Sequence, residues 1–416
     1  MPQHGDESAM KLLYFATHQL WPLTSGNRLR DYHLARHLAA RASVTFMEIC
    51  HSWEQPSSPP DRHEFNDIIS KYRGGGYSFG NVVRGMVGGT PLTVLSYSHA
   101  RIRSALAEVL SRFRFDAVQI EGVQLSEYLS IILSAPNAPA VLVDWHNIES
   151  ELMWRYSRNA ERWSQRLVAR RTAALLERSE LRLLQSCGTH TVTSLRDKEQ
   201  LLLRCPFANV HVVPNGVDTR YFSRRALTGE RRYRQCGPTR SLIFVGSMDY
   251  HANVDAVRWF VREIWPAVAQ KYPDLEFIIV GRNPTFEVRQ LASHRIKVTG
   301  TVEDVRPYYA SALGLVAPLR VGSGTRLKIL EAMSAEVPVV STRLGAEGID
   351  VQNDVHLLLA DSEAEFSAAI DTIATSVPTR SRLTGAARDL VVSRYDWSAA
   401  ANELYRIHRD CLQTVA

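Results

Sequence analysis

The feature that most constrains this chain is an alternation of short apolar segments with helix-like segments, which occurs in two separate series. The first series passes from KLLYFATHQL through a helical stretch to SVTFMEI. The second passes from SLIFVGSM through LEFIIVG, KVTG and LGLVAPL to VPVVST, with helices between them. Strand–helix–strand repeats of this kind form parallel sheets with right-handed crossovers. The sequence therefore predicts an α/β protein with two doubly wound, Rossmann-like parallel sheets.

The length and the linker composition divide the chain into two parts. A chain of 416 residues fits two domains of about 200 residues each. Residues 223–240 carry little apolar content and are typical of a linker. We therefore expect a first domain over 1–218, a second over 219–395, and a terminal helix over 396–416 that packs back on the first domain. Two such domains that face each other leave a cleft, a common position for a ligand site.

Composition and charge exclude several classes of protein. A formal charge of +6 suits phosphate-bearing ligands or an anionic membrane surface, but no motif for nucleic-acid binding accompanies it. The five cysteines are scattered, which is typical of reduced thiols. No apolar run reaches the roughly 20 residues of a membrane span, and the start shows no secretory signal. No Gly-x-Gly-x-x-Gly follows the first strand, which argues against a nicotinamide dehydrogenase. We expect a cytoplasmic protein that binds no nucleic acid.

The stretch APLRVGSGTRLKILEAMSAEVPVVST at 317–342 carries the most chemical information. A strand there runs into a glycine turn that opens a helix, and free backbone N–H groups at a helix start form an anion site. Arg326 and Lys328 lie in or beside the first helical turn, where cations are unfavourable without an anion nearby. Glu331 follows one turn later, where its carboxylate could accept two ribose hydroxyl hydrogens. An ordinary turn with a solvated basic face is the alternative.

Polar residues also follow the apolar runs of the first domain. Glu121 and His146 come at the ends of FDAVQIEG and AVLVDWHNI, and the carboxyl ends of parallel strands border the ligand crevice. His146 is a candidate functional residue or a satisfied histidine at a strand end. For Glu121 we favour a helix cap over a residue that faces an acceptor. Asp304 is expected to be the N-cap of a helix over 305–312.

Five arginines recur every three or four residues in a predicted long helix over about 150–186. One face of that helix would carry them, either as a solvated face or as a surface that docks on anionic lipid headgroups. These arginines are Arg155, Arg158, Arg162, Arg166 and Arg170.

Several motifs together resemble the retaining family 4 glycosyltransferases, in particular bacterial sugar transferases associated with exopolysaccharide and PEP-CTERM gene systems. The resemblance covers nearly the whole chain. The motifs are PLTSGNRLR, DWHNIES, VVPNGVD, FVGSM, FIIVGR, VTGTVEDVRPYYASA and GSGTRLKILEAMSAEVPVVST.

The resemblance implies a GT-B fold, in which the second domain binds a nucleotide-diphosphate sugar and the first binds a glycan or lipid-linked acceptor. It implies retention at the anomeric carbon, no cofactor and no obligatory metal. By position it implies that His146 lies beside the transferred sugar and that Arg326 and Lys328 grip the diphosphate. The donor site would comprise Gly26, Arg28, Gly246, Ser247, Val302, Gly324, Thr325, Arg326, Lys328 and Glu331.

Two departures from the family pattern leave alternatives open. Ser323 stands where the family often has a first glutamate, eight residues before Glu331. Ser247 and Ala252, followed by Asn253, stand where an arginine and a lysine are usual. The alternatives to a glycosyltransferase of surface polysaccharide synthesis are a degenerate GT-B protein that binds sugar nucleotide without turnover, and another GT-B enzyme such as a sugar-nucleotide epimerase.

Overall fold

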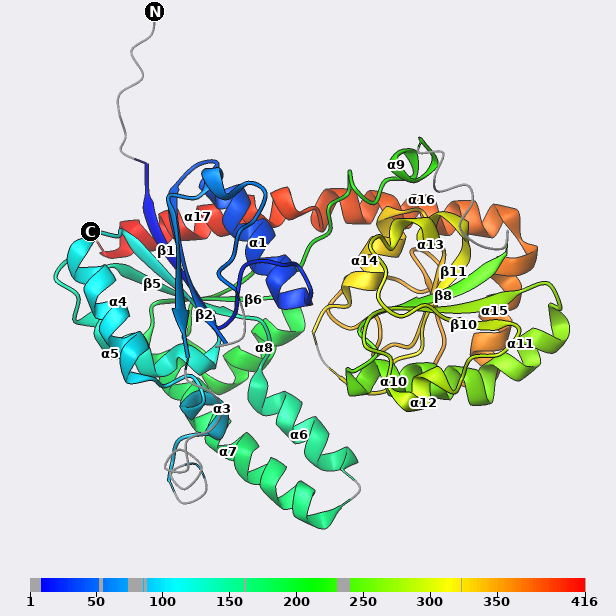
Figure 1. Ribbon diagram of the computed structural model, residues 1–416, viewed down its shortest axis with the longest axis horizontal. Helices are drawn as coiled ribbons and strands as arrows, with labels where there is room; N and C mark the ends of the chain where they lie inside the picture. The colour runs from blue at the N-terminus through cyan, green and yellow to red at the C-terminus, as the bar shows by residue number, and fades with distance from the viewer. Residues whose placement is uncertain are drawn as a thin grey trace, which may run out of the picture. The chain divides into compact units, whose positions relative to one another are not determined.

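The chain forms two compact units, each built round its own parallel sheet (Figure 1). The computed structural model describes residues 9–51, 55–73, 85, 88–160, 162–229, 240–322 and 324–415. The first unit comprises Met1–Pro214 and Ala400–Ala416, and the second comprises Asn215–Ala399. The predicted fold class, α/β with two sheets of parallel strands, is confirmed.

The first sheet has seven strands in the order β3-β2-β1-β4-β5-β6-β7. All of its neighbouring strands run parallel. The strands are β1 Lys11–Ala16, β2 Ser43–Cys50, β3 Asp67–Tyr72, β4 Ala117–Glu121, β5 Ala140–Trp145, β6 Thr189–Val192 and β7 Val210–Val212.

Helices cover both faces of this sheet because alternate strand residues point to opposite sides. Leu13 and Phe15 of β1 join the apolar core under helix α4, whereas the Tyr14 hydroxyl reaches Asp31 of α1 on the other face. The helices of this part of the chain are α1 Gly26–Ala39, η1 Arg62–Glu64, α3 Leu92–Leu95, α4 Ala100–Arg112, η2 Val123–Tyr128, α5 Leu129–Leu133, α6 Glu149–Asn159, α7 Trp163–Ser186 and α8 Leu195–Arg204.

The last helix, α17 (Trp397–Val415), joins the first unit from Ala400 onward. His408 Nε2 shares a 2.9 Å hydrogen bond with Gln119 Oε1 of β4. Cys411 Sγ donates to Thr189 Oγ1 of β6 at 3.0 Å. Helix α17 therefore packs on the sheet that is formed by the N-terminal half of the chain.

The second sheet has six strands in the order β10-β9-β8-β11-β12-β13. Leu242 and Phe244 of β8 face one apolar core, and Ile243 and Val245 face another on the opposite side. The strands are β8 Ser241–Val245, β9 Glu276–Val280, β10 Ile296–Val298, β11 Ala312–Ala317, β12 Val339–Ser341 and β13 Leu358–Leu359. The helices are α9 Arg224–Gly229, α10 His251–Trp259, the π-helical turn η4 Phe260–Ile264, α11 Trp265–Lys271, α12 Phe286–Arg289, α13 Arg306–Ser311, α14 Leu327–Ser334, α15 Glu363–Thr375 and α16 Val377–Arg394.

The single helix predicted over about 150–186 is wrong, because two helices occupy that range. Helix α6 ends at Asn159 and α7 begins at Trp163. Ala160 and Arg162 between them have extended backbone, with ψ of 133° at both residues, and this ends one helical ladder before the next begins. The two helices pack against each other as a hairpin (Figure 1). None of the helices in the described part of the chain combines the length and the apolar character that crossing a membrane requires.

Candidate functional site

Each sheet has a point where the strand order reverses, and the polar residues gather there. In the first sheet this point lies between β1 and β4. His18 follows β1, Glu121 ends β4 and His146 follows β5. Connections leave the two strands at such a point in opposite directions, which opens a crevice at the carboxyl ends. The fold thus brings together residues that are far apart in the sequence.

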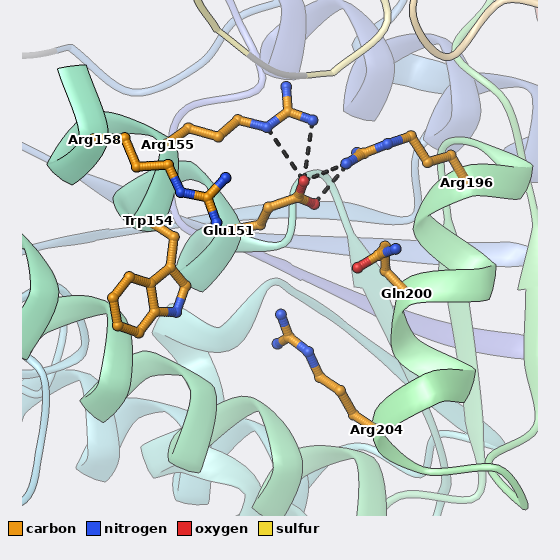
Figure 2. A pocket seen from close by; sticks show the side chains of 7 residues that line it. All are labelled: Glu151, Trp154, Arg155, Arg158, Arg196, Gln200 and Arg204. Carbon is orange, nitrogen blue, oxygen red and sulfur yellow. Dashed lines mark hydrogen bonds and ion pairs between the residues drawn. The ribbon is translucent and has the colours of Figure 1, made fainter.

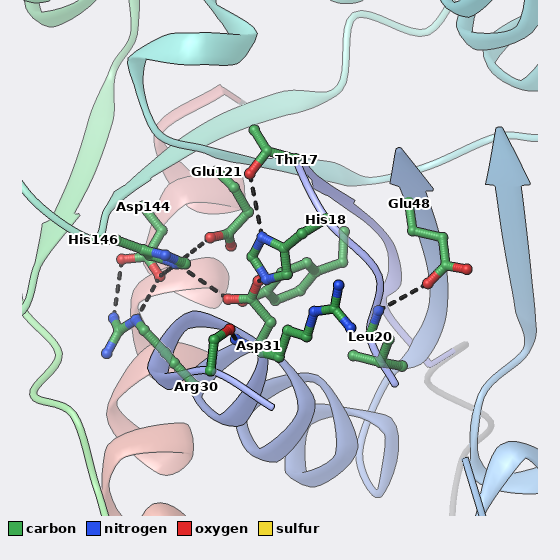
Figure 3. Close-up of polar contacts among 12 residues, drawn as sticks. Thr17, His18, Leu20, Arg30, Asp31, Glu48, Glu121, Asp144 and His146 are labelled. Atoms are coloured by element: carbon green, nitrogen blue, oxygen red, sulfur yellow. Dashed lines mark hydrogen bonds and ion pairs between the residues drawn. The ribbon is translucent and has the colours of Figure 1, made fainter. Parts of the chain in front are cut away.

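Two histidines and two carboxylates contact one another in this crevice (Figure 3). His146 Nε2 pairs with Glu121 Oε2 and lies 3.1 Å from Asp31 Oδ1. The other Asp31 oxygen, Oδ2, lies 2.7 Å from His18 Nε2. Asp31 and Glu121 are buried, whereas His18 and His146 are partly exposed. A proton held among these groups can therefore reach the edge of the crevice through a histidine.

The pKa values in this cluster are shifted in opposite directions. Burial raises the pKa of Glu121 to about 8, and the neighbouring Asp31 charge adds to this shift. Burial alone would lower the pKa of His146, but the charges of Glu121 and Asp31 hold it well above its ordinary value. Asp31 is also buried, yet His146 and then His18 hold its pKa below the ordinary range. The cluster therefore favours a charged His146 paired with at least one carboxylate near neutral pH.

Asp31, Glu121 and His146 also form a possible metal set, since one ligand atom from each lies within 4.8 Å of the others. The His146 nitrogen in contact with both carboxylates is Nε2. A cation bound by all three residues through this nitrogen would have to displace the proton that joins them. The geometry thus accommodates a proton shared among the three side chains as it stands. A metal ion would fit only after it had displaced that proton.

Glu121 does not cap a helix, so the interpretation that we favoured is wrong. The following helix η2 begins after Gly122 and has no side-chain cap, while the Glu121 side chain contacts His146. Gln119 Nε2 donates to Glu121 Oε1 at 3.3 Å, and Gln119 Oε1 is bonded to His408 Nε2. A buried carboxylate with a histidine partner is a component of the crevice and not of a helix end.

A buried glutamate on β2 fixes the loop that carries His18. Glu48 Oε2 accepts hydrogen bonds from the backbone N–H of Leu20 at 2.8 Å and from Ser57 Oγ at 2.6 Å. Its other oxygen accepts from Ser70 Oγ at 2.6 Å. Since the Glu48 side chain is buried, these bonds hold the loop after β1 in one conformation.

The structure places Gly26 and Arg28 at the first turn of α1, directly after that loop. Ser25 is the N-cap and its Oγ accepts from the Arg28 backbone N–H at 3.4 Å. The Arg28 guanidinium donates to the Pro22 carbonyl at 3.3 Å. A helix start with a glycine and a cation is suited to an anion, so the predicted role of both residues stays a prediction.

In the second sheet the order reverses between β8 and β11. Gly246 and Ser247 follow β8, and the loop after β11 runs through Gly322 and Gly324 into α14 at Leu327. Both glycines of that loop have positive φ, 110° and 79°. A Cβ on Gly322 would lie 2.8 Å from the tip of the Arg326 side chain, and the φ of 110° is a backbone conformation that favours glycine. Ser323, a departure noted in the sequence, lies outside the described residues.

Lys328 lies between the two loops. Its Nζ donates to Asn253 Oδ1 at 2.9 Å and lies 3.8 Å from the centre of the Phe244 ring. A Cβ on Gly246 would lie 2.9 Å from the same Nζ. Burial, and then the charge of Arg326, lower the pKa of Lys328 well below its ordinary value. A cation held in this way is stabilised by any anion that enters beside it.

Glu331 lies one turn further along α14, and its partner is a tyrosine. The Tyr309 hydroxyl donates to Glu331 Oε2 at 2.7 Å. Burial raises the pKa of this carboxyl, which the Tyr309 hydrogen bond and the Lys328 charge partly oppose. One Glu331 oxygen is thus already engaged, whereas the sequence suggested a carboxylate that accepts two hydroxyls. Thr325 is buried, and Val302 packs at the edge of the adjacent core.

The sequence did not predict that Arg282 contributes to the loop after β8. Arg282 Nε donates to Ser247 Oγ at 2.9 Å, which brings a guanidinium to a position where the family usually has its own arginine. The residue ends FIIVGR, next to a strand end, and this was the available signal. Asp31 and Arg30 were missed as well, because a helix face gives no sign of which sheet edge it meets.

Two further sequence predictions need correction. Asp304 is not an N-cap: helix α13 follows Val305, and Asp304 Oδ1 accepts the Arg306 backbone N–H while its carboxylate pairs with the Arg306 guanidinium. The five arginines do not share one helix face, because the break between α6 and α7 separates them. Arg155 and Arg158 lie on α6 and line a pocket with α8, whereas Arg166 and Arg170 lie on α7.

Two family models match the chain over most of its length. Residues 32–221 match "Glycosyltransferase Family 4", and residues 239–376 match "Glycosyl transferases group 1". The boundary between the two matches lies close to the division between the structural units.

Curated relatives and a solved structure are also similar to this chain. It is 30% identical over 209 residues to a phosphatidyl-myo-inositol mannosyltransferase of Mycobacterium tuberculosis, which covers 47% of this chain and 53% of the relative. It is 22% identical over 175 residues to an uncharacterized 44.6 kDa protein in the cps region of Klebsiella pneumoniae, covering 40% of this chain and 45% of the relative. The chain thus spans about half the length of these curated relatives.

The solved structure is a sucrose-phosphate synthase from Thermosynechococcus elongatus, which superimposes with a TM-score of 0.72 at 16% identity. The match covers 98% of this chain and 100% of the synthase. At this identity it shows the fold alone. The two family models, which together match most of the chain, show that it belongs to the family 4 glycosyltransferases, and the solved structure shows the GT-B fold.

Proposed function

We propose that this protein is a retaining glycosyltransferase that moves a sugar from a nucleoside-diphosphate sugar to a glycan or lipid-linked acceptor in surface polysaccharide synthesis. The observation that carries the proposal is the lysine and arginine held at the start of α14. Lys328 is partly desolvated and faces Gly246, while Arg326 packs against Gly322. Glycines that leave the backbone open beside two cations fit a diphosphate.

The reaction needs the diphosphate to leave the anomeric carbon with the bonding electron pair. Arg326, Lys328 and the N–H groups at the α14 start supply positive potential where that negative charge develops. The acceptor hydroxyl oxygen bonds to the same face of the anomeric carbon, and its proton passes to the departing phosphate oxygen. No enzyme nucleophile, cofactor or metal takes part in this scheme.

His146 is proposed to lie beside the transferred sugar. Its pairing with Glu121 and Asp31 keeps the ring oriented and charged. Because the two carboxylates hold Nε2, the charged imidazole can donate from Nδ1 to a hydroxyl or phosphate oxygen. The mycobacterial relative is named for a phosphatidyl-myo-inositol acceptor. That name supports a lipid-linked acceptor here.

A contact with an anionic membrane would suit such an acceptor, and α7 offers the surface for it. Large apolar side chains are exposed there, and arginines lie among them. The apolar residues are Trp163 at 78%, Leu167 at 62% and Val168 at 63% exposed, and the arginines are Arg162, Arg166 and Arg170. Apolar insertion combined with basic residues is the pattern of a peripheral membrane helix. Sedimentation with phosphatidylglycerol vesicles should fall for Trp163→Ala, but not for Leu203→Ala, an equally exposed apolar residue on α8.

The main proposal is tested in two steps, first by donor binding and then by transfer of the sugar to an acceptor. A panel of nucleoside diphosphates and their sugars should include one that raises the melting temperature. That donor, with an extracted glycolipid fraction as acceptor, should give a product whose new linkage keeps the donor's anomeric configuration in its NMR coupling constants. An inverted linkage would overturn the retaining mechanism, and a covalent sugar–enzyme adduct would overturn the direct transfer.

The second candidate is a protein that binds sugar nucleotide without turnover. Ser247 and Ala252 at the positions usually held by arginine and lysine favour it. Donor binding with neither transfer nor hydrolysis would support this candidate. A product that keeps its nucleotide would instead point to an epimerase.

A further inference from the structure

A pocket of about 550 Å³ in the first unit lies between helices α6 and α8, and its lining is rich in arginine (Figure 2). The spacing explains why one face of each helix lines it. The lining residues of α6 lie at positions i, i+3, i+4 and i+7, and those of α8 recur every four residues, so each set lies on one side of its helix. The lining residues are Glu151, Trp154, Arg155 and Arg158 of α6, and Arg196, Gln200 and Arg204 of α8.

The lining carries four arginines and one carboxylate. Further carboxylates lie behind two of these arginines: Arg204 pairs with Glu180 and lies 3.8 Å from Glu177, and Arg196 lies 3.9 Å from Asp197. Glu151 accepts hydrogen bonds from Arg155 Nη2 at 3.0 Å and from Arg196 Nη1 at 3.3 Å. Burial would raise the pKa of Glu151, but the hydrogen bond and charge of Arg196, together with Arg155, hold it below its ordinary value. The carboxylate is therefore ionised and holds both guanidinium groups in place.

Arg204 is fixed from behind by a second carboxylate. Its Nη1 donates to Glu180 Oε2 at 2.7 Å and to Ser150 Oγ at 2.9 Å. The Glu180 side chain is fully buried and the Arg204 side chain is 19% exposed. Arg158 and Gln200 extend toward the same space from the two helices (Figure 2). Arg155, Arg196 and Arg204 are thus positioned before any ligand arrives, which lowers the entropic cost of binding one.

We propose that this pocket binds the phosphate or diphosphate group of a phosphorylated saccharide. Planar guanidinium groups match the geometry of phosphate oxygens and bind them through two hydrogen bonds. The volume exceeds that of a phosphate, and the Trp154 indole on one wall offers a flat apolar surface to a sugar ring. The pocket belongs to the first unit, so it is separate from the diphosphate site proposed in the second.

The source of the phosphate is either a soluble sugar phosphate or a lipid-linked one, and only this assignment rests on the proposed function. In the lipid-linked case the pocket would hold the charged group of the acceptor. The binding itself requires no transfer reaction. If glycosyl transfer is not observed, phosphate binding in this pocket can still be measured, so the two proposals can fail independently.

The experiment uses the full chain with Arg326→Ala and Lys328→Met, which removes the proposed diphosphate site of the second unit. Calorimetry of this double variant with inorganic pyrophosphate, glucose 1-phosphate and farnesyl diphosphate should detect binding at one site per chain. Gln200→Glu should weaken binding by about tenfold or more, because it places a second carboxylate against the anion, and Arg158→Gln should weaken it several-fold. Stronger binding of farnesyl diphosphate would assign the lipid source, and stronger binding of glucose 1-phosphate the soluble one.

Matched controls change the same charges outside the pocket. Gln165→Glu and Arg178→Gln lie at exposed positions on α7. They should leave binding within about twofold of the background protein. Melting curves show whether each variant is folded. The proposal is overturned if none of the three probes binds a folded background protein, or if the pocket variants weaken binding no more than these controls.

Discussion

Arg30 of α1 and Asp144 of β5 form a buried ion pair through two hydrogen bonds. Arg30 Nε lies 3.0 Å from Asp144 Oδ2, and Arg30 Nη2 lies 3.0 Å from Asp144 Oδ1 (Figure 3). Thr191 Oγ1 donates to the same carboxylate at 2.7 Å. The pair joins the helix that carries Asp31 to the strand that leads to His146. It therefore fixes the distance across which those two residues meet.

Replacing Arg30 by methionine should destabilise the first unit strongly. Asp144 would stay buried without its guanidinium partner, and breaking a buried pair costs about 3–5 kcal/mol. The double variant Arg30→Met/Asp144→Leu removes both charges and should recover most of that loss, as measured by urea unfolding. A double variant no more stable than Arg30→Met would show that the pair does not act as a unit.

Glutamine at position 121 should flatten the pH dependence of stability on the alkaline side. The pKa of Glu121 is raised to about 8, from an ordinary value of 4.5. Between pH 4.5 and about 8 the folded protein therefore holds a proton on Glu121 that the unfolded chain has released. The stabilisation is therefore complete below about pH 4.5 and lost as the pH rises through about 8. Melting temperatures of Glu121→Gln should fall less over this range than those of the wild type. An unchanged slope would contradict the assignment.

His408→Gln should reduce the loss of stability at acidic pH. Burial lowers the pKa of His408 to about 4, so the folded protein resists a proton that the unfolded chain accepts. Stability is thus present above about pH 6.5 and falls as the pH drops through about 4. Melting curves should show a smaller acid loss in His408→Gln, whereas the exposed His63→Gln should behave like the wild type. Equal acid losses in all three proteins would exclude this role of His408.

Lys328→Met should separate stability from donor binding. The variant keeps most of the volume of a side chain whose charge is opposed by burial and by Arg326, so the protein without donor should melt at the same temperature or higher. Loss of one charge-assisted contact, about 1.5–3 kcal/mol, should weaken binding of the nucleoside diphosphate about 10- to 100-fold. Calorimetry measures the affinity of the wild type and of Lys328→Met for the nucleoside diphosphate. Lys271→Met, which changes an exposed lysine of α11, serves as the control. Unchanged affinity in Lys328→Met would remove this residue from the donor site.

The sheets were predictable because apolar runs such as SLIFV and EFIIV are continuous and are separated by helix-length segments. The start of α14 was predictable too, since its glycines and cations are consecutive. The proton-sharing cluster was not. Asp31 is one of several polar residues of helix α1, and only the strand order β1-β4-β5 brings it to Glu121 and His146. The break between α6 and α7 was missed because no proline or glycine marks it.

The hydrogen bonds from His408 through Gln119 to Glu121 have a consequence for biosynthesis. A ribosome releases the first 214 residues long before it reaches Ala400, and the whole second unit is made in between. Until then Gln119 lacks its hydrogen-bond partner His408, although the strands of the first sheet can already pair. The first unit therefore gains this contact only once α17 has been made. Loss of His408 would remove the partner of Gln119 and so affect the cluster around Glu121, which lies much earlier in the chain.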